Sequence, residues 1–269
     1  MGGTGFLGSF VATRLTDRPL SVMVRPTSDT SVLPEGIDLR TGTLEDEHLP
    51  LEDVGTVVYC ASMGFGHVPR LVEQLQVAGV KRGVFVSTTA IFTSLPSASR
   101  EPRLEAEAVV QASALDWTIV RPTMIYGTAR DRNISRLLRF LARWPFFPLC
   151  GNALWQPIYV EDLADAVVTA LDTPATVRGT YNLAGAYPLR FDDLVRTAAR
   201  TLFRRVMLVR VPVSAAVLAA HVTRVVSAEQ VRRLAEDKAF DYSEAAHDFG
   251  FNPRSFAEGV RLEARGLGL

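Results

Sequence analysis

The stretch that decides the fold is Gly2-Gly3-Thr4-Gly5-Phe6-Leu7-Gly8. Glycines at positions 2, 5 and 8 permit a tight turn, close approach of the backbone to a pyrophosphate, and close packing of the following helix. A helical pattern at Ser9–Leu15 and a buried-strand pattern at Leu20–Val24 follow, which is the context this motif needs. The stretch therefore predicts a turn that binds the phosphates of a dinucleotide, with all seven residues as candidate contacts, rather than an ordinary strand-to-helix turn.

A basic residue, Arg25, ends the strand that follows the glycine stretch. An acid at this place would accept hydrogen bonds from the ribose hydroxyls of NAD, whereas a guanidinium pairs with the 2′-phosphate of NADP. Thr27 and Ser28 add hydroxyl donors. We therefore expect NADP(H) rather than NAD(H) as the cofactor. The alternative is a solvated arginine with no ligand.

Short Val-rich runs alternate with helical patterns up to about residue 120. Such runs are typical of strands buried on both faces, and the alternation predicts an α/β fold with a doubly wound parallel Rossmann sheet. The predicted strands are Leu20–Val24, Ile37–Arg40, Thr56–Cys60, Gly83–Ser87 and Trp117–Val120, and the predicted helices between them are Phe10–Leu15, Pro69–Ala78 and Arg103–Ala114.

The sequence pattern changes after Arg121–Pro122, where frequent prolines and glycines interrupt the alternation of strands and helices. We expect a dinucleotide-binding domain at 1–123, and at 124–269 the remaining sheet elements with a small, mainly helical C-terminal lobe. Two helix starts carry capping boxes, Ser227-x-x-Gln230 and Ser255-x-x-Glu258. The predicted elements are helices at Glu161–Leu171, Asp192–Leu202, Ser227–Glu236 and Ser255–Ala264, a strand at Tyr181–Leu183, and a strand followed by a core helix within Val206–Val226.

The glycine stretch follows Met1 directly, so the strand that should lead into it is expected to be missing. In this fold that strand lies in the middle of the sheet, and its absence would leave two neighbours with unpaired backbone groups.

Composition bounds the class of protein. The 269 residues are 48% apolar and carry a formal net charge of zero, which gives no electrostatic case for nucleic acid or an anionic membrane. Cys60 and Cys150 are too few for a disulfide framework. No signal peptide and no transmembrane segment are apparent, so we expect a cytoplasmic protein with a small-molecule substrate and no metal site.

Several longer motifs resemble the short-chain dehydrogenase/reductase superfamily, specifically its extended and atypical branches, the NAD-dependent epimerase/dehydratase group. The resemblance covers essentially the whole chain. Besides the glycine stretch, the motifs are Val84-Phe85-Val86-Ser87-Thr88-Thr89, Trp117-Thr118-Ile119-Val120-Arg121-Pro122-Thr123-Met124-Ile125-Tyr126-Gly127, Gln156-Pro157-Ile158-Tyr159-Val160-Glu161-Asp162-Leu163-Ala164 and Tyr181-Asn182-Leu183-Ala184-Gly185.

The resemblance implies a role for further residues. Thr88 takes the place of the catalytic Ser/Thr, which hydrogen-bonds a substrate oxygen, and its neighbour Thr89 is a candidate substrate contact. The other implied positions are Ala61 and Ser62 beside the cofactor's diphosphate and ribose, Pro122 and Thr123 beside the nicotinamide, and Asp131, Arg132 and Asn133 toward the substrate.

One departure from the family pattern concerns the proton donor. The family's Tyr-x-x-x-Lys pair uses lysine to lower the tyrosine pKa, but Ser99 and Arg103 stand at those positions. Neither of the two lysines, Lys81 and Lys238, has a tyrosine four residues before it. The remaining donor candidates are Tyr126, Tyr159 and His67, and for both tyrosines the alternative is a core residue with a satisfied hydroxyl.

Two functions remain open. The first is an NADP(H)-binding oxidoreductase, or a nucleotide-sugar epimerase/dehydratase-like enzyme, that works without the usual pair. The second is a catalytically silent protein that binds dinucleotide as a sensor or in an assembly. The retained Thr88 favours the first, and the missing pair favours the second.

Overall fold

The computed structural model describes residues 1–212 and 236–269, which fall into two compact units. The predicted capping box at Ser227, nearly all of the predicted helix that it begins, and the core helix predicted to end at Val226 lie outside the described residues. Unit 1 comprises Met1–Pro122, Val160–Leu183 and Tyr242–Asn252, and unit 2 comprises Thr123–Tyr159, Ala184–Asp241 and Pro253–Leu269.

Unit 1 is built on parallel strands, which confirms the predicted fold class. Its four-stranded sheet has the order β10-β5-β4-β3, and β1 pairs with β2 in a separate two-stranded sheet. Central residues such as Phe85 and Ile119 are completely buried, as expected of strands covered on both faces. The strands are β1 (Ser21–Val24), β2 (Asp38–Thr41), β3 (Thr56–Tyr59), β4 (Arg82–Val86), β5 (Asp116–Pro122) and β10 (Gly179–Leu183).

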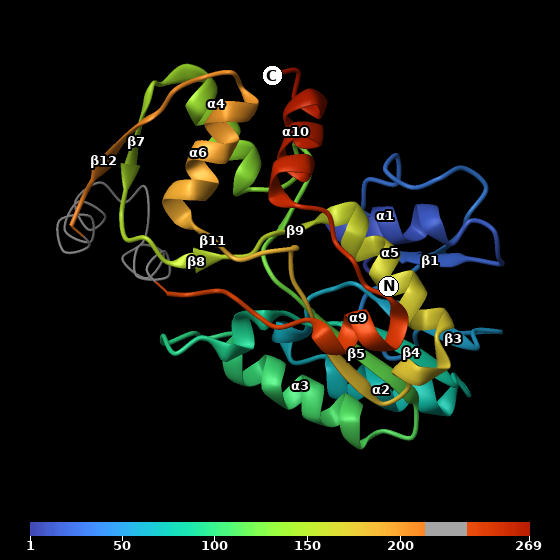
Figure 1. Ribbon diagram of the computed structural model, residues 1–269. Helices are drawn as coiled ribbons and strands as arrows, with labels where there is room; N and C mark the ends of the chain where they lie inside the picture. The colour runs from blue at the N-terminus through green and yellow to red at the C-terminus, as the bar shows by residue number, and fades with distance from the viewer. Residues whose placement is uncertain (213–235) are drawn as a thin grey trace. The chain divides into compact units, whose positions relative to one another are not determined.

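Helices cover both faces of the four-stranded sheet. Leu71 and Leu75 of α2 and Val110 of α3 pack with Phe85 and Ile119 of the sheet in one hydrophobic cluster. Helix α5 packs on β4 and β5, and α1 lies beside α5 (Figure 1). The helices of this unit are α1 (Phe6–Arg14), α2 (Val68–Val77), α3 (Arg100–Ala112), α5 (Val160–Asp172) and α9 (Ser243–Phe249).

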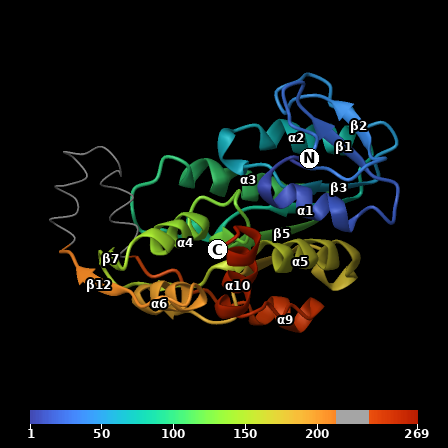
Figure 2. The same cartoon turned by 90° about the horizontal axis from the view of Figure 1, so that it is seen from above.

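Unit 2 is mainly helical, and its helices α4, α6 and α10 pack on one another (Figure 2). The predicted capping box at the start of α10 is confirmed: the Ser255 side chain accepts from the Glu258 backbone N–H, and the Glu258 carboxylate accepts from the Ser255 backbone N–H. The helices are α4 (Ile134–Arg143), α6 (Phe191–Thr201) and α10 (Phe256–Gly266), and the short strands are β6 (Ile125–Tyr126), β7 (Phe146–Leu149), β8 (Leu154–Trp155), β9 (Ile158–Tyr159), β11 (Leu189–Arg190) and β12 (Met207–Arg210).

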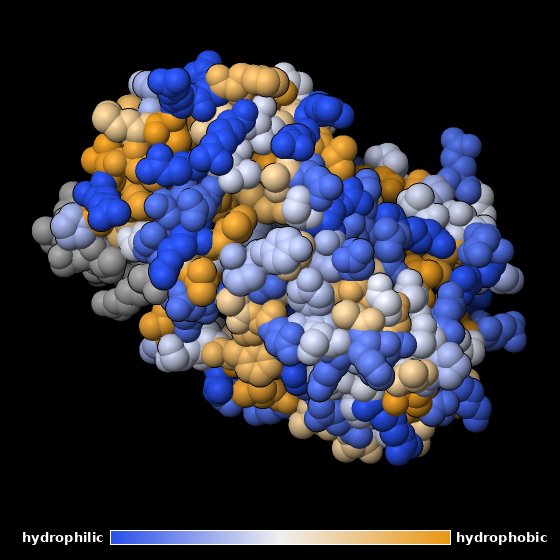
Figure 3. All heavy atoms as spheres, in the orientation of Figure 1, coloured by the Kyte–Doolittle hydropathy of each residue, from blue (hydrophilic) through white to orange (hydrophobic). Residues whose placement is uncertain are grey.

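The strand predicted from Val206 onward is β12, and it pairs in parallel with β7. This two-stranded pair is partly exposed, unlike the sheet of unit 1, and Phe146 and Met207 are among its exposed apolar side chains. Figure 3 shows hydrophobic surface over this part of unit 2, interspersed with hydrophilic residues.

Candidate functional site

The glycine stretch forms a tight turn that leads into α1. The Gly5 N–H donates to the Gly2 carbonyl oxygen at 3.0 Å, and Gly5 is the N-cap of the helix. Gly2 has a φ of 75°, and a Cβ built on it would lie 2.7 Å from the backbone nitrogen of Ala61. A Cβ on Gly8 would lie 2.0 Å from the Gly2 carbonyl oxygen. Larger side chains at these two positions are therefore incompatible with the turn.

A pocket of about 640 Å³ lies beside this turn, within unit 1. It is bounded by segments that follow the carboxyl ends of β1, β2 and β3, where ligands bind in open parallel sheets. Its volume falls in the range of cofactor sites. The lining residues that the sequence predicted are Gly2, Thr4, Gly5, Arg25, Ser28, Ala61 and Ser62.

Arg25 follows β1 directly and is an exposed residue on the wall of this pocket. Its backbone N–H donates to the Ser28 hydroxyl at 3.2 Å, so Ser28 holds the turn that carries the guanidinium. Because Arg25 is exposed, its guanidinium stays hydrated in the protein without ligand, and it can still pair with an anionic group in the pocket. The glycine turn and Arg25 therefore share one binding space.

One part of the pocket wall, the segment that follows β2, was not predicted from the sequence. Gly42, Thr43, Leu44 and Glu45 line it, and the Thr43 hydroxyl donates to Asp46 at 2.6 Å to hold this turn. The signal was available, because a glycine followed by polar residues at the end of a predicted parallel strand marks the ligand edge of the sheet.

His67, one of the proton-donor candidates, also lines the pocket. Its Nε2 is hydrogen-bonded to the hydroxyl of Tyr59, a fully buried residue of β3. Burial lowers the pKa of His67 and raises the pKa of Tyr59. The pair is therefore neutral at physiological pH, with the imidazole held in place by a tyrosine that the sequence analysis did not single out.

Thr88 and Thr89 follow β4 and differ in their surroundings. Thr88 is half-buried, and its Oγ1 accepts from the Ala90 N–H at 3.2 Å, an arrangement that leaves the hydroxyl proton to rotate toward another acceptor. Thr89 is buried, and its hydroxyl donates to the Pro122 carbonyl oxygen at 3.2 Å. Thr88 has the geometry of a group that can donate to a ligand, while Thr89 holds the end of β4 to the end of β5.

A buried ionic network lies next to these threonines. Glu107 of α3 accepts a hydrogen bond from the hydroxyl of Ser87 and pairs with the guanidinium of Arg121, whose Nε lies 3.1 Å from both carboxylate oxygens. The Arg121 guanidinium also lies over the Phe92 ring, 5.2 Å from its centroid. Arg121 is thus engaged with a carboxylate of its own unit and holds the end of β5 to α3.

Ser99 and Arg103, the two residues that the sequence resemblance aligns with the family's catalytic pair, bind each other. Arg103 Nη1 donates to Ser99 Oγ at 2.7 Å. The Arg103 side chain also approaches Gly64, because a Cβ on Gly64 would lie 3.3 Å from Arg103 Nε. Neither group can lose a proton near neutral pH, so this arrangement positions hydrogen-bond donors and does not relay a proton.

Tyr126 is embedded in the hydrophobic core of unit 2. Its side chain is 1% exposed, and its ring packs against Tyr159 and Phe256 with centroids 5.5 and 5.4 Å away. A Cβ on Gly259 of α10 would lie only 2.1 Å from the Tyr126 hydroxyl oxygen. This environment favours the packing alternative for Tyr126 over its predicted catalytic role.

The three residues predicted to face a substrate directly precede α4. Asp131 is buried, and its carboxylate accepts from the backbone N–H groups of Asn133 at 2.7 Å and Ser135 at 3.3 Å. Arg132 and Asn133 are exposed. Burial and the neighbouring Asp131 together raise the pKa of Glu263 in α10 to about 10. The Asp131 carboxylate therefore binds backbone N–H groups at the start of α4 and borders a buried glutamate whose pKa is raised.

Pro122 and Thr123 occupy the end of β5 and the residue that follows it. The Pro122 carbonyl accepts from Thr89, as described above. Thr123 is buried, and its hydroxyl donates to the Gln156 carbonyl oxygen at 2.5 Å. Both hydrogen bonds hold backbone segments together, and a role of either residue beside a nicotinamide stays a prediction.

The described residues, 1–212 and 236–269, are considered next for metal sites and membrane-spanning helices. No cluster of three or more His, Cys, Asp or Glu side chains could hold a metal ion in that part of the chain. No helix within the same residues has the length and apolar character that crossing a membrane requires.

Comparison with known proteins gives matches of three kinds. A family model described as NAD(P)H-binding matches residues 2–143. The chain is 34% identical over 110 residues to subunit 9 of the NADH dehydrogenase 1 alpha subcomplex of Arabidopsis thaliana, a match that covers 40% of this chain and only 27% of that protein. It is 24% identical over 257 residues to the UDP-glucose 4-epimerase of Vibrio cholerae, covering 79% of this chain and 77% of the epimerase.

Among solved structures, the UDP-glucuronic acid 4-epimerase of Bacillus cereus in complex with NAD superposes with a TM-score of 0.76. The superposition covers 99% of this chain and 97% of the epimerase at 16% sequence identity. At this identity the likeness shows a shared fold.

Proposed function

The chain belongs to the NAD(P)H-binding family, and on this premise we propose that it binds NADP(H) in the pocket of unit 1 and acts as an oxidoreductase of the short-chain dehydrogenase/reductase type. The observation that carries the proposal is that Arg25 and the glycine turn line the same pocket. The turn fits phosphates because Gly2 and Gly8 leave no room for a Cβ, so that backbone N–H groups at the start of α1 can approach a ligand.

The preference for NADP(H) rests on the chemistry of Arg25. Its guanidinium can make a charge-assisted, two-pronged pair with a 2′-phosphate, which NAD(H) lacks. Ser28 holds the Arg25 backbone, and Thr43 and Glu45 bound the same wall on the side of β2. NAD binding would call for a carboxylate directly after β1, and Arg25 stands there; Glu45, the carboxylate among the described residues of this lining, follows β2 instead.

Thr88 is the residue that we assign to the substrate. A bound nicotinamide supplies or accepts a hydride, and the reaction also needs a hydrogen bond to the oxygen at which charge develops. The half-buried Thr88 hydroxyl at the end of β4 supplies that bond. The substrate is a small molecule with a carbonyl or hydroxyl group, and nucleotide sugars are the first class to test, because the epimerases named above act on them by name.

A second candidate function is a catalytically silent dinucleotide-binding protein. The hydrogen bond between Arg103 and Ser99 favours it, because the usual proton-relaying pair is replaced by two groups that hold each other. The similarity to a subunit of NADH dehydrogenase favours it too, since that relative is named as part of an assembly.

Turnover separates the two candidates. We expect the wild-type protein to change NADPH absorbance with at least one member of a panel of nucleotide sugars and carbonyl compounds. Thr88→Val should lower kcat by roughly 10²-fold through loss of a hydrogen bond to the reacting oxygen. Thr88→Ser should restore most of the rate, and Ser99→Ala should leave the rate nearly unchanged. Full activity of Thr88→Val on a confirmed substrate would contradict the assignment of Thr88, and normal NADPH binding without turnover in any variant would favour the silent alternative.

A further inference from the structure

The formal net charge of zero conceals a separation of charge between the two units. Unit 1 carries eleven basic and twenty acidic side chains, a net charge of −9. The described residues of unit 2 carry fifteen basic and eight acidic side chains, a net charge of +7. The excess is local, since residues 132–143 hold four arginines without an acid and residues 194–210 hold five. The charge of the whole chain therefore says little about the anions that unit 2 attracts.

Four of these arginines surround a pocket of about 240 Å³ in unit 2. Two lie on α6 and two in the segment between α6 and β12, and the described lining contains no carboxylate. Within the described residues, none of the four guanidinium groups has a hydrogen-bond or ion-pair partner. This arginine pocket consists of Arg196, Arg200, Arg204 and Arg205 with Ala199 and Val206.

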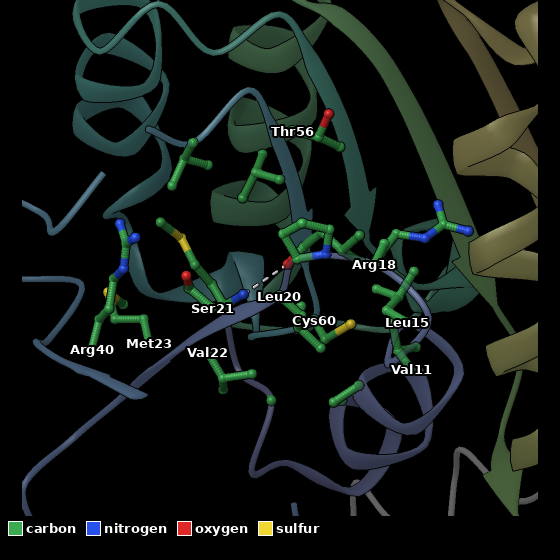
Figure 4. Close-up of a pocket in the computed structure, with 18 of the residues that line it drawn as sticks. Val11, Leu15, Arg18, Leu20, Ser21, Val22, Met23, Arg40, Thr56 and Cys60 are labelled. Atoms are coloured by element: carbon green, nitrogen blue, oxygen red, sulfur yellow. Dashed lines mark hydrogen bonds between the residues drawn. The ribbon is translucent and has the colours of Figure 1, made fainter. Parts of the chain in front are cut away.

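The arginines beside a cavity of unit 1 are, by contrast, paired. That cavity has a volume of about 150 Å³, and Arg18 and Arg40 belong to its lining (Figure 4). Arg18 Nη1 lies 2.8 Å from the Asp172 carboxylate, and Arg40 Nε lies 2.9 Å from that of Asp38. The arginine pocket holds four like charges without such partners, so an anion between them relieves their repulsion. A phosphate suits this place, because parallel N–H groups of a guanidinium fit its oxygens.

The strands next to the arginine pocket present an exposed apolar face. In the parallel pair of β7 and β12, Met207 lies opposite Phe146 and Val209 opposite Pro148. Alternate residues of a strand share a face, and all four of these side chains are exposed, whereas their neighbours in each strand pack on the core of unit 2. We call these four the ribbon face. It adjoins the arginine pocket, because Val206 of the pocket lining directly precedes β12.

Phe203 belongs to the same stretch of chain, between α6 and β12. Its side chain is 99% exposed, and its φ of 55° lies in the left-handed region, which is uncommon for a bulky residue. The Arg204 N–H donates to the Ala199 carbonyl oxygen at 3.0 Å and so holds this turn. A large ring held in water is unfavourable, and burial at an apolar boundary makes it favourable.

We propose that the arginine pocket, Phe203 and the ribbon face together dock on a membrane surface that contains anionic phospholipid. The guanidinium groups pair with lipid phosphates, and the apolar side chains enter the boundary between headgroups and acyl chains. Basic and apolar side chains on one face are the combination by which proteins bind a membrane surface without crossing it.

Other partners use this face less completely. Single-stranded nucleic acid binds to basic grooves in which aromatic rings stack on the bases, and Pro148, Met207 and Val209 have no aromatic ring. A two-fold dimer through this face would bring the same arginines toward each other, which their like charges oppose. An anionic lipid surface is the partner that uses both the charges and the apolar side chains.

The test measures co-sedimentation of the full chain with sucrose-loaded vesicles. One set is phosphatidylcholine alone, and the other is an equimolar mixture of phosphatidylcholine and phosphatidylglycerol. We expect partition onto the anionic vesicles to be at least about tenfold stronger at low salt, and the difference to shrink as salt screens the arginines. Equal partition onto both sets, or partition onto neither, would overturn the proposal.

Two variants separate the charges from the apolar side chains. Arg204→Gln with Arg205→Gln should weaken partition onto anionic vesicles by roughly tenfold or more. The matched control, Arg261→Gln with Arg265→Gln, removes the same charge from exposed positions of α10 and should have a much smaller effect. Phe203→Asn should weaken partition too while keeping Tm, because asparagine tolerates the left-handed conformation. Equal effects of the two arginine pairs, or full partition of Phe203→Asn, would contradict docking through this face.

Two further measurements cover the other occupants. Poly(U) RNA should give no anisotropy change at a salt concentration at which the anionic vesicles still bind. The reverse order would assign the face to nucleic acid and overturn the proposal. Light scattering should give the same mass for the wild-type protein and Phe203→Asn, and a dimer that this variant dissociates would assign the face to a second copy of the chain instead.

Discussion

The glycine turn with Arg25 in unit 1 and the segment from Tyr126 to Asn133 in unit 2 both hold residues that the sequence predicted to contact ligands, and the two regions use their polar groups differently. Around the pocket, the predicted residues belong to turns at strand ends, and Arg25 is exposed on its wall. In unit 2, Tyr126 is in the hydrophobic core and the Asp131 carboxylate accepts from backbone N–H groups of α4. The difference teaches that a motif fixed by backbone geometry predicts which residues line a pocket more securely than a polar residue type in a loop does.

The largest effect should come from adding a methyl group to the glycine turn. In Gly8→Ala the Cβ would lie 2.0 Å from the Gly2 carbonyl oxygen, so the turn must move away from α1. We expect NADPH affinity to fall by at least about 100-fold, roughly 3 kcal/mol, as measured by calorimetry. Gly55→Ala is the matched control, because no atom lies within 4 Å of its added Cβ. If a folded Gly8→Ala protein binds NADPH with unchanged affinity, the glycine turn does not bind the cofactor, and the difference between the pocket of unit 1 and unit 2 is lost.

The next prediction concerns the core of unit 2. Gly259→Ala directs its Cβ at the Tyr126 hydroxyl, which the surrounding rings hold in place. Overpacking of this kind should lower the free energy of unfolding by roughly 2–3 kcal/mol, measured by denaturant titration. Tyr126→Phe removes the hydroxyl, so it should recover part of the loss in the double variant. If Tyr126→Phe alone abolishes turnover on a confirmed substrate, Tyr126 is a catalytic residue and its packing role is secondary.

A smaller effect should follow from neutralising Glu263. Its side chain is 1% exposed, and its pKa is raised to about 10 by burial and by Asp131. Between the ordinary glutamate pKa and about 10, the folded state holds a proton that the unfolded state releases, so stability falls as pH rises. Glu263→Gln should remove this slope and raise stability at pH 7 by roughly 1–2 kcal/mol.

The control for this prediction is Glu105→Gln, which changes an exposed carboxylate of α3. We expect its stability to follow the wild-type pH dependence. A wild-type stability that is flat between pH 5 and 9, measured by thermal melts in matched buffers, would show that Glu263 is ionised in the folded protein.

Much of unit 1 could be predicted from sequence. The runs at Leu20–Val24 and Thr56–Cys60 became β1 and β3 to within one residue at each end, because apolar strands between turn formers leave few alternatives. The glycine stretch and Arg25 were placed together by a rule of topology, that the carboxyl ends of parallel strands meet. The same rule also applies to Gly42, which follows β2, but the pocket wall formed there was not predicted.

The surroundings of individual polar side chains could not be predicted. Whether Tyr126 faces a ligand or a helix depends on Gly259, which lies 133 residues further along the chain. The same holds for Arg121, whose partner Glu107 belongs to a different element. Periodicity reports which face of an element is buried, but the partner of a buried polar group is fixed only by tertiary packing. The partner of His67, Tyr59, was missed for this reason.

The most direct test of the central claim is calorimetric titration of the wild-type protein and Arg25→Ala with NADPH and NADH. The account predicts that the wild-type protein binds NADPH more tightly than NADH. It also predicts that Arg25→Ala weakens NADPH binding at least about tenfold, roughly 1.4 kcal/mol, while NADH binding changes by less than about twofold. Lys81→Ala, an exposed cation at the amino end of β4, should alter neither affinity. Equal losses of NADPH and NADH affinity in Arg25→Ala would contradict the placement of a 2′-phosphate at Arg25.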